Sequence, residues 1–125
     1  MDKSLADKLR YKQGRAIIIN IPDGLSMGIN SELELEGKFE YLQLFVRSAQ
    51  ELDEWLPQVL DKLNEDAVLW ICYPKMTSKI KTDVNRDIIG KIVEDTTEYR
   101  LVSNVAIDDT WSALRLRLKS KVKSK

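Results

Sequence analysis

The sequence predicts an α/β fold: a single-domain layered sandwich with a mainly parallel sheet of about five strands, an antiparallel C-terminal edge strand and two to three helices. Three observations lead to this prediction. Apolar runs of strand length alternate along the chain with stretches of helical periodicity. The length of 125 residues suits one domain. The composition, 43% hydrophobic and 32% charged, is that of a globular protein.

The N-terminal part of the chain is expected to form a short helix and then a strand. Ser4 can cap a helix whose apolar face includes Leu5 and Leu9, and Gly14 ends it. Residues 16–21 follow, and they are rich in β-branched side chains, which is typical of a strand covered on both faces. This strand would therefore be buried.

The next segment is the hardest to interpret. Residues 32–36 alternate acidic and apolar side chains, which predicts a short edge strand. Residues 39–46 become apolar on both faces, as expected for a second central strand.

The clearest helix begins after Ser48. Ser48 and Glu51 form a capping-box pair, and apolar side chains recur at helical spacing as far as Leu63. Pro57 lies inside this pattern and must kink or restart the helix, because proline removes a backbone hydrogen bond. The outer face is acidic, which is most simply a face exposed to water.

Residues 67–92 form the unit around which the rest of the chain is arranged. An unbroken apolar run at residues 67–73 predicts a buried central strand that contains Trp70. After a polar loop, the next helix is expected to begin through Thr82, Asp83 and Asn85.

The last two strands are predicted at residues 99–107 and 112–118, antiparallel to each other. In the second of them, leucines alternate with Arg115 and Arg117, the pattern of an edge strand with charge on its solvent side. We therefore expect one domain over residues 1–118. The remaining residues, 119–125, are expected to be a disordered basic tail.

The charge distribution bears on the kind of partner. The formal net charge is zero, but the tail holds four of the 20 basic residues and no acid, so residues 1–118 carry a net charge of −4. A mildly acidic body disfavours nucleic acid as a partner. No apolar stretch approaches the roughly 20 residues of a membrane span, and no signal peptide is evident, so a cytoplasmic location is expected.

Several kinds of chemistry are excluded by composition. The chain has no histidine, which excludes the usual zinc sites and the histidine-based nucleophilic triads. Its one cysteine, Cys72, excludes an internal disulfide and, inside an apolar strand, is expected to be a buried inert thiol. We expect no cofactor and no metal, and we favour a function without catalysis.

A candidate ligand site lies in the loop at residues 74–82. In an open parallel sheet ligands bind beyond the carboxyl ends of the strands, and this loop follows such an end. It supplies three lysines and three hydroxyls ahead of a helix N-terminus, where an anion is favoured. The glycines of a phosphate-binding loop are missing, and most lysine-rich loops are simply solvated. The candidate residues are Lys75, Ser78, Lys79, Lys81 and Asn85.

A second group of candidates lies in the last turn. Asp109 and Thr110 follow a strand end, although Asp-Asp-Thr is also good turn chemistry. Trp111 is either a stacking or interface residue or a cover over the end of the core. Arg115 is in step with Trp111 along the strand, which makes a cation–π contact between them plausible.

Five blocks of the sequence resemble a family of small bacterial proteins of unknown function. The blocks are LADKLRYKQG at 5–14, LFVRS at 44–48, LWICYPK at 69–75, KTDVNRD at 81–87 and VAIDDTWSALR at 105–115. The resemblance implies a small cytoplasmic bacterial α/β domain. It implies no activity, substrate or catalytic residue, and the basic tail lies outside it.

Three functions remain open at this point. The sequence favours a non-enzymatic binding or interaction domain that uses the strand ends and Trp111, with a protein partner or a small anionic ligand. An anion or nucleotide-phosphate binding protein, with or without enzymatic activity, would use the loop from Lys75 to Thr82. A self-associating structural protein would use the edge strand.

Overall fold

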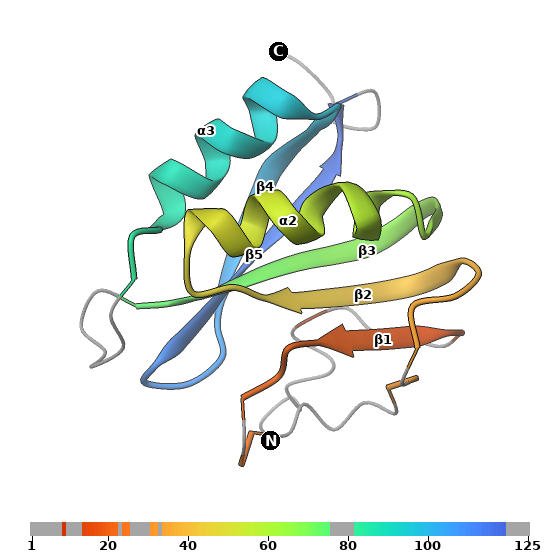
Figure 1. Cartoon of the computed structure of the whole chain (residues 1–125), viewed down its shortest axis with the longest axis horizontal. Coiled ribbons are helices and arrows are strands. Elements are labelled where there is room, and N and C mark those ends of the chain that lie inside the picture. Colours follow the sequence, from red (N-terminus) through yellow and green to blue (C-terminus); the bar gives the residue numbers. More distant parts are fainter. Residues whose placement is uncertain are drawn as a thin grey trace.

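The computed structural model describes residues 9, 14–22, 24–25, 31–32, 34–75 and 82–119. These residues form one sheet and two helices, so the α/β class is confirmed (Figure 1). The strands are β1 (Ala16–Ile19), β2 (Phe39–Phe45), β3 (Leu63–Pro74), β4 (Tyr99–Ala106) and β5 (Trp111–Leu118), and the helices are α2 (Ala49–Leu60) and α3 (Arg86–Thr96).

The sheet is mixed, so the prediction of a mainly parallel sheet is wrong. Its strand order is β1-β2-β3-β5-β4. β1 and β3 both pair with β2 in parallel, whereas β5 pairs antiparallel with both β3 and β4. After α3 the chain enters β4 at the far edge, and a tight turn then returns it into the space beside β3. A connection that short can only produce an antiparallel pair.

The position of β5 also differs from the prediction. Its antiparallel pairing with β4 is confirmed, but it lies inside the sheet, and β4 is the edge strand. The alternation of leucine and arginine was misleading because Arg115 and Arg117 are half-buried on one face of an internal strand. At the other edge, the described residues of the strand predicted at 32–36, namely 32 and 34–36, form only an isolated parallel bridge between Glu32 and Ile17.

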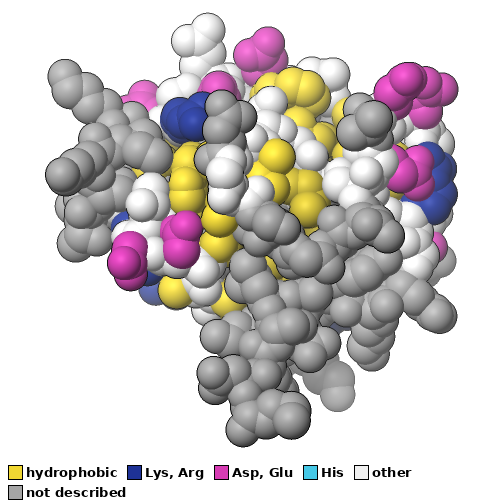
Figure 2. All heavy atoms as spheres, turned by 90° about the horizontal axis from the view of Figure 1, so that it is seen from below, with side chains coloured by type: hydrophobic (Ala, Val, Ile, Leu, Met, Phe, Trp, Pro, Cys, Tyr) yellow, Lys and Arg dark blue, Asp and Glu magenta, His cyan; other side chains and the backbone are white. Residues whose placement is uncertain are grey.

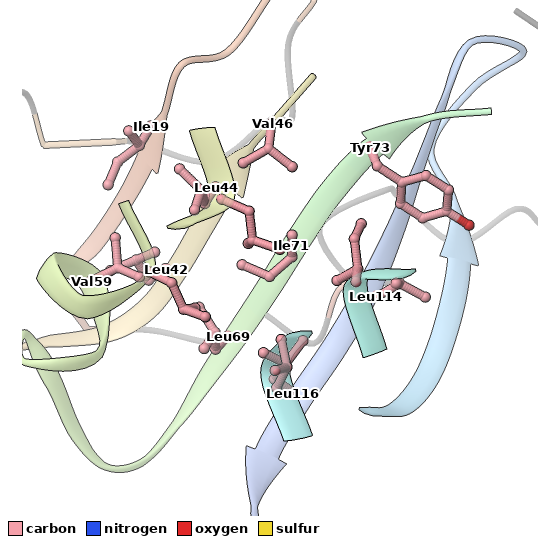
Figure 3. Close-up of a cluster of buried hydrophobic side chains, with 14 of the residues drawn as sticks. Ile19, Leu42, Leu44, Val46, Val59, Leu69, Ile71, Tyr73, Leu114 and Leu116 are labelled. Carbon is pink, nitrogen blue, oxygen red and sulfur yellow. The ribbon is translucent and has the colours of Figure 1, made fainter. Parts of the chain in front are cut away.

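Both helices pack on the same face of the sheet (Figure 1). The strands alternate, so every second residue of β2, β3 and β5 points toward the helices, and these side chains form the main core (Figure 3). The sheet contributes Ile19, Leu42, Leu44, Leu69, Ile71, Leu114 and Leu116, and the helices contribute Leu52, Leu56, Val59, Ile89 and Val93.

The opposite face of the sheet has a second buried cluster around Trp70. This side chain is fully buried, as predicted, and its indole Nε1 donates a hydrogen bond to the carbonyl oxygen of Leu9 at 2.7 Å. Phe45, Cys72 and Trp111 belong to the same cluster. Apart from Leu9 and Gly14, the helix predicted near the N-terminus lies outside the described residues.

The helix α2 begins as predicted and ends earlier. The Ser48 hydroxyl accepts a hydrogen bond from the Glu51 backbone N–H at 3.1 Å, which confirms the cap. Pro57 lies inside a continuous helix that ends at Leu60, and β3 begins at Leu63, before the predicted start of the strand. Within the described ranges, no helix is long and apolar enough to cross a membrane.

Candidate functional site

The structure brings several predicted site residues to one edge of the sheet. The backbone N–H of Lys75, at the end of β3, donates to the carbonyl oxygen of Thr110 at 2.7 Å. The N–H of Ala49, at the start of α2, donates to the carboxylate of Asp83 at 2.8 Å. The rule that ligands bind beyond the carboxyl ends of strands, here called the strand-end rule, thus grouped residues that are far apart in sequence.

The polar groups at this edge mostly stabilise local structure. The Asn85 side chain accepts a hydrogen bond from the Ile88 N–H at 2.9 Å and caps α3. In the β4–β5 turn, the Asp108 carboxylate accepts from the N–H groups of Thr110 and Trp111 at 2.8 and 2.7 Å, and Asp109 is exposed. The remaining candidates, Ser78, Lys79 and Lys81, lie outside the described residues.

Trp111 covers the end of the core and does not present its ring to solvent. Only 4% of the residue is exposed, and its ring meets Phe45 edge-on, with centroids 5.2 Å apart. The guanidinium of Arg47 lies 5.7 Å from the centroid of the Trp111 ring. A cation–π contact to this tryptophan is thus made by Arg47, and Arg115 lies opposite Trp70 in the ladder between β3 and β5.

Three polar side chains are buried together beneath the sheet. The Tyr41 hydroxyl donates to Gln43 Oε1 at 2.7 Å, and Gln43 Nε2 donates to the Cys72 sulfur at 3.3 Å. Burial raises the pKa of the Cys72 thiol and of the Tyr41 phenol far above their ordinary values. Both groups therefore keep their protons at neutral pH, as expected of an inert buried thiol.

A groove that no sequence pattern predicted lies beside α2. It has a volume of about 820 Å³ and lies between α2 and the junction of α3 with β4, beside the end of β5. We call it the α2 groove. It is lined by Asp53, Leu56, Pro57, Leu60, Asp61, Thr96, Thr97, Glu98, Tyr99 and Leu118.

The α2 groove has an apolar floor and an acidic rim. The lining includes four apolar or aromatic side chains: Leu56, Leu60, Tyr99 and Leu118. Leu56 is buried and the other three are half-buried, so they keep apolar surface available to a ligand. The exposed acids at the groove are Asp53, Asp61 and Glu98. Burial also raises the pKa of Tyr99, so this phenol stays neutral.

Backbone groups add to the negative potential of the groove. The C-terminal ends of α2 and α3 both line it, and neither helix has a basic residue in its last turn. A helix C-terminus carries a partial negative charge because its last carbonyl groups lack helical partners. Pro57 has no N–H, so the carbonyl of Asp53 also lacks its usual partner one turn later.

Two lysines already bind near these helix ends, one just before β2 and one just after β5. The ammonium of Lys38 donates to the carbonyl oxygen of Asp61 at 2.7 Å, next to the end of α2. The ammonium of Lys119 donates to the carbonyl oxygen of Glu94 at 3.0 Å, in the last turn of α3. The surroundings of the groove therefore attract ammonium groups.

Two other surfaces are less well defined. A hollow of about 650 Å³ on the other side of α2 shares Pro57 and Asp61 with the groove and is lined further by Leu35 and Trp55. Figure 2 views the molecule from below and shows apolar side chains in the middle of that face, with charged ones toward its margins.

Among the residues that the structure describes, no group of three or more aspartate, glutamate or cysteine side chains is arranged to hold a metal ion. Comparisons with protein-family models, with curated proteins and with solved structures found no significant match to this chain. The resemblance of the five sequence blocks to a family of small bacterial proteins therefore stays a prediction.

Proposed function

We propose that the protein is a non-enzymatic binding domain of the cytoplasm. Its α2 groove would take a segment of a partner protein in which lysine or arginine side chains flank apolar ones. The observation that carries this proposal is the combination of an apolar floor with three exposed acids, Asp53, Asp61 and Glu98.

The two parts of the groove would contribute differently to binding. Burial of apolar side chains against Leu56, Leu60 and Tyr99 supplies affinity, at roughly 25 cal/mol per Å² of apolar surface. The rim selects the sign of the ligand charge, but each exposed ion pair contributes only about 0.2–1 kcal/mol. The resulting affinity is modest and falls as salt is added.

The chemistry of the buried polar groups favours binding over catalysis. Burial raises the pKa of Cys72 and of Tyr41, and both side chains lie on the face of the sheet opposite the helices. A protonated thiol that solvent does not reach is a poor nucleophile. The α2 groove itself offers carboxylates and carbonyl groups that suit recognition of a cation.

The other two hypotheses receive less support. Self-association through β5 loses its basis because β5 is internal, and the edge strand β4 has Arg100 and an irregular register between Leu101 and Ser103, features that oppose edge-to-edge pairing. The anion hypothesis stays a prediction for the loop from Lys75 to Thr82, and capping of α3 accounts for the Asn85 side chain without a ligand.

A peptide titration tests the proposal. The probe is a fluorescent peptide of sequence Lys-Leu-Lys-Leu-Lys, followed by anisotropy, with the glutamate counterpart Glu-Leu-Glu-Leu-Glu as the control ligand. We expect saturable binding of the basic peptide only. The double variant Asp53→Asn with Asp61→Asn should weaken it about fivefold, because two carboxylates at about 0.5 kcal/mol each are lost.

The matched control is Glu54→Gln, since Glu54 is an exposed acid of the same helix that does not line the groove. This variant should bind the basic peptide like the native chain. Equal weakening in both variants would show general charge attraction, and equal binding of the two peptides would show an unselective apolar surface. Either result would overturn the proposed function.

A further inference from the structure

The C-terminal tail of this chain has the composition that the α2 groove selects. We propose that residues 120–125 bind the groove within their own molecule and compete there with the partner segment. The inference rests on the proposed function, because it assigns a second occupant to the same groove. It makes binding of the partner dependent on displacement of the tail.

The chain leaves the described fold at the edge of the groove. β5 ends at Leu118, whose side chain lines the groove. The next residue, Lys119, donates its backbone N–H to the carbonyl oxygen of Glu98 at 2.7 Å, and Glu98 also lines the groove. The tail therefore starts next to the surface that it would occupy.

The charges of the tail and of the groove are opposite. Lys119 already places its ammonium on the last turn of α3, 3.0 Å from the carbonyl oxygen of Glu94. Three more lysines follow, Lys121, Lys123 and Lys125, with no acid among them. Asp53 and Asp61 lie on the α2 side of the groove, where they can attract these later lysines.

The length of the tail and its one apolar residue fit the groove. Val122 is three residues beyond Lys119, so an extended chain carries it up to about 10 Å from that point. This reach is long enough for Val122 to contact the lining of the groove next to Leu118. Attachment to the same chain gives the tail an effective concentration on the order of millimolar, so weak contacts suffice.

Full-length variants test the inference by amide chemical shifts and by peptide affinity. Lys121→Gln with Lys123→Gln weakens the tail, and Lys91→Gln with Arg100→Gln removes the same charge from exposed positions outside the groove. The amides of Asp53, Leu56 and Asp61 are read because they are far from the tail in sequence.

We expect the tail variant to shift these α2 amides and to bind the Lys-Leu-Lys-Leu-Lys peptide about threefold more tightly than the native chain. The control variant should do neither, and salt at about 0.5 M should remove the difference, because it screens exposed charges. If the peptide binds all three proteins equally and the α2 amides stay in place, the inference is overturned and the proposed function stands. If the peptide binds none of them, both fall.

Discussion

Trp70 shows how far a single residue can be interpreted from sequence. The apolar run around it predicted a buried position, and the structure places it at 0% exposure in the central strand β3. The run did not indicate the indole hydrogen bond to Leu9, which joins residues 61 positions apart. Trp70 thus connects the middle of the sheet to the N-terminal part of the chain.

Replacement of Trp70 is the residue-scale test of the core. Trp70→Ala should lower the free energy of unfolding by roughly 3–5 kcal/mol, because it removes a large buried side chain and leaves a cavity. Urea denaturation followed by circular dichroism measures this. Val102→Ala, at a residue 38% exposed on β4, is the control and should change the midpoint little. A midpoint unchanged in Trp70→Ala would contradict the described packing.

The ion pair of Arg15 and Glu32 gives a pH-dependent prediction. The Arg15 guanidinium donates to the Glu32 carboxylate at 2.6 Å, and this hydrogen bond lowers the pKa of Glu32 below its ordinary value of 4.5. The contribution of the pair to stability is complete well above pH 4.5 and is lost as the pH falls through the lowered pKa.

In Glu32→Gln, the thermal midpoint should therefore decrease less than in the native chain as the pH falls below about 4.5. Arg15→Gln should reduce this decrease in the same way, because either change removes the interaction. A native-like pH profile in both variants would mean that the pair does not form in solution.

At the scale of elements, the helix starts were predictable because caps are local. The Asn85 side chain accepts a hydrogen bond from the backbone N–H three residues later. The capping residue and its partner are therefore close together in the sequence, where the cap can be recognised. Asn85→Ala should cost about 1 kcal/mol in the free energy of unfolding, and Asn85→Asp should retain stability, since a carboxylate also caps a helix. Chemical denaturation measures both. A large loss in Asn85→Asp would contradict a capping role.

The position of β5 was not predictable for a physical reason. Its alternating pattern reports that one face is apolar and the other is polar, and this is equally true of an edge strand and of an internal strand with long arginines half-buried on one side. The early end of α2 was missed because Leu63 continues the helical spacing of apolar residues, although it belongs to β3.

At the scale of the whole molecule, the proposed binding site differs from the candidate residues that the sequence analysis named. The strand-end rule depends only on chain direction, and it correctly grouped Lys75 with Thr110. The α2 groove instead combines α2, the end of α3, the start of β4 and the end of β5. No single segment of the sequence contains the residues that line the groove, because the apolar floor and the acidic rim come together only in the folded chain.

The measurement that tests the central claim most directly is an amide chemical-shift map of the native chain titrated with the Lys-Leu-Lys-Leu-Lys peptide. It reports the location and the affinity of binding together. The claim that the groove is the binding site predicts saturable shifts at Asp53, Leu60, Asp61 and Tyr99, which decrease as salt is added. Shifts centred on Lys75, Asn85 and Thr110, with the groove amides unchanged, would contradict this claim. They would mean that the peptide binds at the strand ends.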